Sequence, residues 1–337
     1  MATRPPKLNY VSDGVPGITR KKKGRGWAYY DAEGKRIIDR DEIDRLNRVA
    51  LPPAYTDAWY CPSGKGHIQA TGIDAKGRKQ YRYHPEFRAH KEGEKFDGCV
   101  LFGERLPRVR KRVEQDLAGS RLSRAHAIAS VVRLLDLGVI RIGNEAYAKS
   151  NKSFGATTLR QRHAEVEGHR LKLKFKAKSG KIREVTITDR RLAHFVRKMQ
   201  DLPGQHLFQY ETEDGALHHV GSAEVNAYLC QTMGEGFTAK NFRTWHASVL
   251  AFQILAEAKG TISLKALMEE VSEKLGNTPT IARKSYVHPA VVALVERQIK
   301  WRETLKLPRR TKWLSRYERG LLNLLEESPA AGELLAA

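Results

Sequence analysis

The chain has 337 residues, and its 60 Lys and Arg against 38 Asp and Glu give a formal net charge of +22. At about 100–200 residues per domain, this length predicts two domains and a sizeable core. The charge is not confined to a tail, since 18 basic and 10 acidic residues precede position 91. A polyanion contacted by both parts is favoured over a soluble protein that is merely basic.

Cysteine usage and hydropathy restrict the protein class further. The three cysteines, Cys61, Cys99 and Cys230, are scattered and form no C-x-x-C pair. Neither a disulfide framework nor a zinc site is expected, and no His, Cys and Asp cluster stands out. The first residues lack the apolar core of a signal peptide, and no run approaches 18 apolar residues. We expect a reduced cytoplasmic protein with no metal, no small-molecule cofactor and no membrane contact.

Residues 1–90 are expected to form a β-rich N-terminal domain, because Gly, Pro and aromatic residues interrupt short apolar runs. A hairpin is predicted between 27–31 and 36–38, and a helix from 42 to 50. The charged, Gly-containing stretch 91–95 is the expected connection to a second domain.

Residues 91–337 are expected to form a mainly helical catalytic domain, so the predicted fold class is α+β. A buried helix is predicted from Ser123 to Gly138. In 170–188, apolar residues alternate with Lys and Arg around a Ser179–Gly180 turn, which predicts a hairpin with one apolar and one basic face. The last predicted helix, Leu314–Leu325, is amphipathic.

A tyrosine and two arginines supply residue types suited to phosphodiester transfer. Tyr286 stands in a basic stretch of the sequence, and a tyrosine nucleophile, with an intrinsic pKa of about 10, gains from a positive field. The reaction passes through a crowded, negatively charged state, which Arg141 and Arg243 could clamp with bidentate hydrogen bonds. Each arginine taken alone is more typical of an ordinary surface residue.

The departing sugar oxygen is a poor leaving group, so a positioned lysine is a sensible general acid. Lys178 stands at the predicted hairpin tip, where its ammonium could reach into a groove. Chemistry alone does not favour it over Lys176 or Lys181.

Several ordered motifs resemble the small, poxvirus-like type IB DNA topoisomerases, particularly their bacterial members. The segments that carry the likeness are Gly66–Tyr83, Arg141–Tyr147 (R-I-G-N-E-A-Y), Phe154–Arg160, Lys240–Trp245 (K-N-F-R-T-W) and Leu275–Tyr286. Lys178 follows Arg141 by 37 positions, and Asn277 precedes Tyr286 by nine. The likeness spans roughly residues 45–290.

The resemblance implies a monomeric, nucleoid-associated enzyme that clamps double-stranded DNA. Tyr286 would attack a phosphodiester and become linked to the 3′-phosphate, while Arg141 and Arg243 stabilise the transition state. Lys178 would protonate the leaving 5′-oxygen, and Asn277, where some relatives carry histidine, would bind a non-bridging oxygen. The free strand end would then swivel, relax the supercoils and reseal without ATP or metal.

The resemblance also marks residues for DNA binding. These are Arg78, Lys79, Gln80, Tyr81 and Tyr83 in the N-terminal domain, and Tyr147, Thr158 and Lys240 in the catalytic domain. Glutamine suits an adenine edge, and tyrosines suit phosphates or sugars. The alternative that Tyr81 and Tyr83 fill the sheet core stays open, because aromatic residues are common in sheets.

Two other functions are compatible with parts of this pattern. A site-specific tyrosine recombinase uses the same Arg, Lys, Arg and Tyr chemistry. Recombinases usually have histidine where Lys240 stands here, and a helical N-terminal domain where this one is β-rich. A non-enzymatic basic DNA-binding protein would explain the charge but not the ordered motifs.

Overall fold

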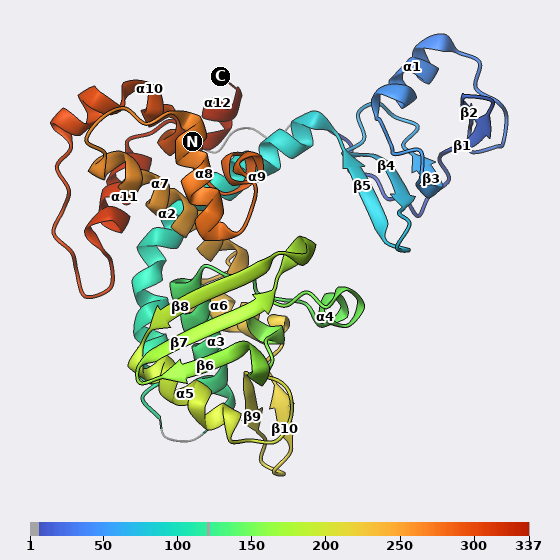
Figure 1. Cartoon of the computed structure of the whole chain (residues 1–337). Coiled ribbons are helices and arrows are strands. Elements are labelled where there is room, and N and C mark those ends of the chain that lie inside the picture. Colours follow the sequence, from blue (N-terminus) through green and yellow to red (C-terminus); the bar gives the residue numbers. More distant parts are fainter. Residues whose placement is uncertain (1–6, 120–121, 337) are drawn as a thin grey trace. The chain divides into compact units, whose positions relative to one another are not determined.

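The computed structural model describes residues 7–119 and 122–336 and divides into two compact units, Met1–Lys95 with Leu335–Ala337 and Phe96–Leu334 (Figure 1). The strands are β1 (Ile18–Lys23), β2 (Gly26–Tyr30), β3 (Thr56–Tyr60), β4 (Ile68–Ile73), β5 (Lys79–Tyr83), β6 (Ala164–Glu167), β7 (Arg170–Lys176), β8 (Ile182–Thr188), β9 (Gln209–Glu211) and β10 (Leu217–His219). The helices are α1 (Arg40–Arg48), α2 (Pro85–Asp116), α3 (Arg124–Gly138), α4 (Glu145–Asn151), α5 (Arg190–Gln200), α6 (Ser222–Met233), α7 (Ala239–Glu257), α8 (Leu264–Leu275), α9 (Pro279–Ser285), α10 (Pro289–Thr304), α11 (Arg316–Glu326) and α12 (Ala331–Ala336). Short 3-10 turns lie at Ala156–Thr158, Gln161–His163 and Lys178–Gly180. None of the helices among the described residues is both long and apolar enough to cross a membrane.

An antiparallel sheet with strand order β2-β1-β3-β4-β5 organises the first unit. The predicted hairpin is confirmed at its turn, where Tyr30 bridges Arg36 and backbone hydrogen bonds join Asp31 to Lys35 and Ile37 to Tyr29. The main partner of β2 is β1, which pairs with it along its whole length and was not predicted. The sequence of β1, Ile-Thr-Arg-Lys-Lys-Lys, did not predict a strand. All of its residues except the first are exposed or only partly buried, so it lacks a repeated apolar position.

Tyr81 and Tyr83 lie on the edge strand β5 and are each 44% exposed. Their rings stack with centroids 5.9 Å apart. The interpretation of these two tyrosines as sheet core is therefore wrong, and they form an exposed aromatic surface.

The expected connection at 91–95 is helical, because α2 runs through it without a break. Lys and Glu are good helix formers, and the ion pair of Lys91 with Glu94, at 2.7 Å, supports the turn. One glycine, Gly93, costs about 1 kcal/mol relative to alanine, which the neighbouring turns offset.

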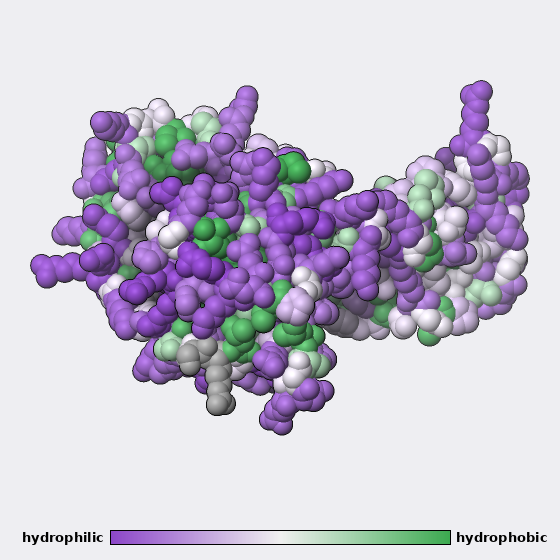
Figure 2. Space-filling view, turned by 60° about the horizontal axis from the view of Figure 1, so that its bottom comes forward, coloured by the Kyte–Doolittle hydropathy of each residue, from purple (hydrophilic) through white to green (hydrophobic). Residues whose placement is uncertain are grey.

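The second unit is mainly helical, as predicted, and packs around α3, whose residues are largely buried. The predicted hairpin is confirmed as β7 and β8, with Leu171, Leu173 and Phe175 buried on one face. A third strand, β6, extends this sheet and was not predicted. Hydrophilic side chains cover most of the face shown in Figure 2, as the high charge requires.

Candidate active site

Two arginines from distant segments meet at one amide. Arg141, between α3 and α4, and Arg243, on α7, both donate hydrogen bonds to Oδ1 of Asn277, the second at 3.3 Å. Because a guanidinium only donates, the amide oxygen of Asn277 must face the two arginines. Its Nδ2 is then left as a buried donor with no acceptor among the described residues.

Arg243 is anchored by the ends of two helices. It is only 4% exposed, and its Nη atoms donate to the carbonyls of Val139, at 2.6 Å, and Leu275, at 3.0 Å. These carbonyls belong to the C-terminal ends of α3 and α8, where the helix dipole favours a cation. Burial lowers the pKa of Arg243 to about 10, with a contribution from nearby Arg141, yet the side chain stays charged at neutral pH.

The Arg141 loop depends on a close backbone approach by a second loop. The carbonyl of Arg141 accepts a hydrogen bond from the backbone N–H of Ala156 at 2.8 Å. A Cβ at Gly155 would lie 2.5 Å from that carbonyl oxygen, so only glycine fits. Thr158, expected near DNA, is buried, and its hydroxyl bonds to the backbone of Gly155. Its placement favours a role in supporting the Arg141 loop.

The nine-residue spacing between Asn277 and Tyr286 spans one short helix, α9, whose N-cap is Thr278. Tyr286 follows the last residue of α9, and its backbone carbonyl accepts a hydrogen bond from Ser248 at 3.2 Å. The guanidinium carbon of Arg243 lies 4.8 Å from the centre of the Tyr286 ring. The residues at both ends of α9, Asn277 and Tyr286, therefore lie close to the same side chain, Arg243.

The electrostatic environment of Tyr286 favours the phenolate. Burial alone raises the pKa of its half-buried phenol. The charge and hydrogen bonding of Arg243, together with the charges of Arg141 and Lys178, outweigh burial and leave the pKa below its ordinary value. A lowered pKa makes the phenol oxygen easier to deprotonate for attack.

Lys178 and Lys181 both belong to the tip of the β7–β8 hairpin, on either side of Ser179 and Gly180. Lys178 is exposed and acts on Tyr286 through its charge. Lys181 lies with its Nζ 3.5 Å from the backbone carbonyl of Asn277 and lines the same cleft. The geometry therefore keeps both lysines as candidates, whereas nothing links Lys176 to Tyr286 in the described contacts.

A cleft of about 220 Å³ opens beside these groups, lined by Arg141, Arg243 and Asn277 among others. Nε of Arg243 and Nδ2 of Asn277 are buried donors without an acceptor of normal geometry among the described residues. Since buried polar atoms are nearly always paired, two such donors suit the oxygens of an anion.

Sequence reasoning missed Arg183, which also lines the cleft. Its guanidinium donates to the backbone carbonyls of Glu273, at 3.0 Å, and Lys274. These are the last turn of α8, so Arg183 fixes the helix end from which Asn277 follows. Its only sequence signal was a place on the predicted hairpin.

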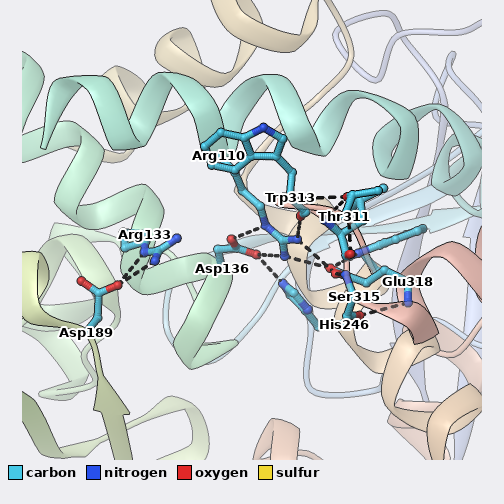
Figure 3. Close-up of polar contacts among 11 residues, drawn as sticks. Arg110, Arg133, Asp136, Asp189, His246, Thr311, Trp313, Ser315 and Glu318 are labelled. Atoms are coloured by element: carbon cyan, nitrogen blue, oxygen red, sulfur yellow. Dashed lines mark hydrogen bonds and ion pairs between the residues drawn. The ribbon is translucent and has the colours of Figure 1, made fainter. Parts of the chain in front are cut away.

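A buried ionic network joins α2, α3, α7 and α11 in the second unit (Figure 3). Arg110 on α2 binds Asp136 and Glu318, each with a closest distance of 2.8 Å. His246, one turn after Arg243 on α7, contacts Asp136 at 2.9 Å. Because Asp136 lies in the last turn of α3, the network fixes both α7 and the carbonyl that binds Arg243.

The predicted DNA-binding residues differ in how they are presented. Tyr147 and Lys240 are exposed, on α4 and in the first turn of α7. In the first unit, Arg78 and Gln80 both donate to the carboxylate of Asp74.

Lys79, also in the first unit, forms an ion pair with Asp13 at 2.5 Å. To bind DNA, Arg78 and Gln80 would have to release Asp74, and Lys79 would have to release Asp13.

The sequence of residues 84–308 matches the catalytic core of eukaryotic DNA topoisomerase I, and residues 26–74 match the N-terminal domain of bacterial DNA topoisomerase IB. DNA topoisomerase 1B of Acanthamoeba polyphaga mimivirus is 31% identical over 287 residues, which is 81% of this chain and 85% of the viral protein. The chain belongs to the type IB DNA topoisomerase family. DNA topoisomerase 1B of vaccinia virus (strain Copenhagen) is 25% identical over 268 residues, 77% of this chain and 83% of that protein. Membership confirms the resemblance and the prediction of an isomerase, and it argues against the recombinase and non-enzymatic alternatives.

Proposed function

We propose that this chain relaxes supercoiled duplex DNA through a transient 3′-phosphotyrosyl bond at Tyr286, without ATP or a required metal. One observation carries the proposal. A tyrosine with a lowered pKa stands against Arg243, beside a cleft with two buried donors, Nε of Arg243 and Nδ2 of Asn277, that have no acceptor of normal geometry among the described residues. The oxygens of a phosphodiester match those donors in charge and hydrogen-bonding capacity.

In the proposed cleavage step, the phenolate oxygen of Tyr286 attacks phosphorus and the P–O5′ bond breaks. Arg141 and Arg243 neutralise the charge on the non-bridging oxygens, and Nδ2 of Asn277 donates to one of them. Lys178 gives its proton to the departing 5′-oxygen. Religation is the reverse reaction, in which the 5′-hydroxyl attacks the phosphotyrosine and frees the phenolate, so the bond energy is retained.

DNA clamping and catalysis are proposed to belong to successive parts of the chain. Residues 1–90 would act as a DNA clamp and residues 91–337 as the catalytic domain of a monomer associated with the nucleoid. The exposed, stacked pair of Tyr81 and Tyr83 supports a DNA-binding role for the first unit. Every proposed catalytic side chain belongs to the second unit.

The deciding experiment is relaxation of negatively and positively supercoiled plasmid in EDTA without nucleotide. We expect complete relaxation of both, without a partner DNA site. An absolute requirement for magnesium or nucleotide would contradict the mechanism. Strand exchange confined to specific sites would identify a recombinase, and binding without topological change would identify a DNA-binding protein.

A further inference from the structure

A histidine–carboxylate cluster lies in the second unit, and the proposed strand transfer does not use it. It consists of Glu145 at the start of α4, His206 just before β9, and His219 at the end of β10. One possible ligand atom from each residue lies within 4.8 Å of the other two. The two imidazole rings stack with centroids 4.3 Å apart, and Nε2 of His206 lies 4.0 Å from Oε1 of Glu145.

The bonding of this cluster is incomplete. Arg160 donates to Oε1 of Glu145 at 3.0 Å, but Oε2 is buried with no hydrogen-bond donor among the described residues. Nδ1 of His206 is buried against the backbone of Thr157. Since buried polar atoms are nearly always paired, Oε2 of Glu145, which receives no hydrogen bond from the described residues, points to an absent ligand.

The donor types of this cluster suit a cation. Two imidazoles and one carboxylate are a donor set that zinc and related divalent transition metals accept.

We propose that Glu145, His206 and His219 form a binding site for a divalent transition cation of the zinc class. Oε2 of Glu145 is the carboxylate atom left for the cation, since Arg160 occupies Oε1. Small side-chain rotations would bring the three atoms to the ~2.0–2.2 Å bonds that zinc makes to nitrogen and oxygen, with water in a fourth position.

Such a cation would connect three segments that are distant in sequence. It would tie α4, which carries Tyr147 and follows the Arg141 loop, to the β9–β10 hairpin. The site goes beyond the proposed strand transfer and lies outside its chemistry, so relaxation in EDTA continues without it. Zinc binding therefore tests the metal site, and plasmid relaxation in EDTA separately tests the proposed function.

The test is a titration of the EDTA-dialysed full-length protein with zinc chloride, in competition with a chromophoric chelator. His219→Ala is the main variant, because His219 is exposed and its removal leaves the core intact. His218→Ala is the matched control, since His218 is also exposed and its side chain points to the opposite side of β10. Glu145→Gln is a second variant, which removes the charge but keeps an acceptor for Arg160.

We expect one equivalent of zinc to bind wild type and His218→Ala with equal affinity. His219→Ala and Glu145→Gln should each bind at least roughly tenfold more weakly. Zinc should also raise the melting temperature of wild type and His218→Ala more than that of His219→Ala. If wild type binds no zinc, or if His219→Ala binds as tightly as wild type, the site does not exist as proposed.

Discussion

Arg243 and Lys178 carry the same charge near the same tyrosine, yet they are held in opposite ways. Arg243 is buried and bound to two helix ends and to Asn277, so its position is fixed before DNA arrives. Lys178 is exposed in a tight turn between β7 and β8, where Ser179 has a φ of 64°. A group that stabilises charge gains from preorganisation, whereas a group that delivers a proton must reach its acceptor.

The strongest test of this comparison removes the group on which both cations act. Tyr286→Phe should abolish the covalent adduct and plasmid relaxation, because in the proposed mechanism the phenol oxygen forms the new bond to phosphorus. DNA binding should persist, since the half-buried ring remains. The measurement is denaturant trapping on a labelled duplex, with a gel-shift assay as the control. A residual adduct, or a wild-type adduct attached to a 5′-phosphate, would refute the assignment.

Lys178→Ala should slow cleavage of an ordinary phosphodiester by about 10²–10⁴-fold, the usual contribution of general acid catalysis. A substrate with sulfur in place of the 5′-bridging oxygen should be cleaved almost normally, because a thiolate leaves without a proton. The readout is single-turnover cleavage of both substrates by the same enzyme.

Lys181→Ala is the matched comparison, since Lys181 comes from the same hairpin and contacts the backbone of Asn277. We expect Lys181→Ala to slow cleavage of the two substrates to a similar extent, and by less than Lys178→Ala slows cleavage of the ordinary phosphodiester. If sulfur rescues Lys181→Ala and not Lys178→Ala, the general acid is Lys181.

Arg243→Gln should lower the cleavage rate by about 10²–10³-fold, which corresponds to the loss of one preorganised donor. It should also change the pH dependence. Arg243 lowers the pKa of Tyr286, so its removal raises that pKa and moves the alkaline rise of the cleavage rate to higher pH. The measurement is the pH profile of single-turnover cleavage, in wild type and in the variant. An unshifted profile would mean that Arg243 does not control the ionisation of Tyr286.

The sequence predicted local features well because their signals are local. The alternation in 170–188 predicted β7 and β8, and a good N-cap predicted the start of α3. The family resemblance implied a common site for Arg141, Arg243 and Asn277, and these three side chains meet in the structure. Strand β1 was missed because its exposed face is almost wholly basic.

What could not be predicted depends on contacts between distant segments. Arg183 acts on carbonyls about 90 residues later in the chain, and its spacing has no motif. The cluster of Glu145, His206 and His219 likewise has no short ligand spacing, so a search for C-x-x-C or neighbouring histidines does not find it. Burial of Thr158 also follows from tertiary packing alone.

The smallest expected effect concerns the exposed tyrosines of the first unit. Replacing both Tyr81 and Tyr83 with alanine should weaken duplex binding by roughly tenfold, if each loses a hydrogen bond worth about 0.5–1.5 kcal/mol. Replacing both with phenylalanine separates hydroxyl contacts to phosphate from stacking by the rings, because the stacked pair is kept. Both variants should fold, since neither side chain belongs to the core of this sheet. Affinity is measured by fluorescence anisotropy at fixed salt, with thermal melting as the folding control. If the folded alanine variant binds duplex as tightly as wild type, β5 is not part of the DNA-binding surface.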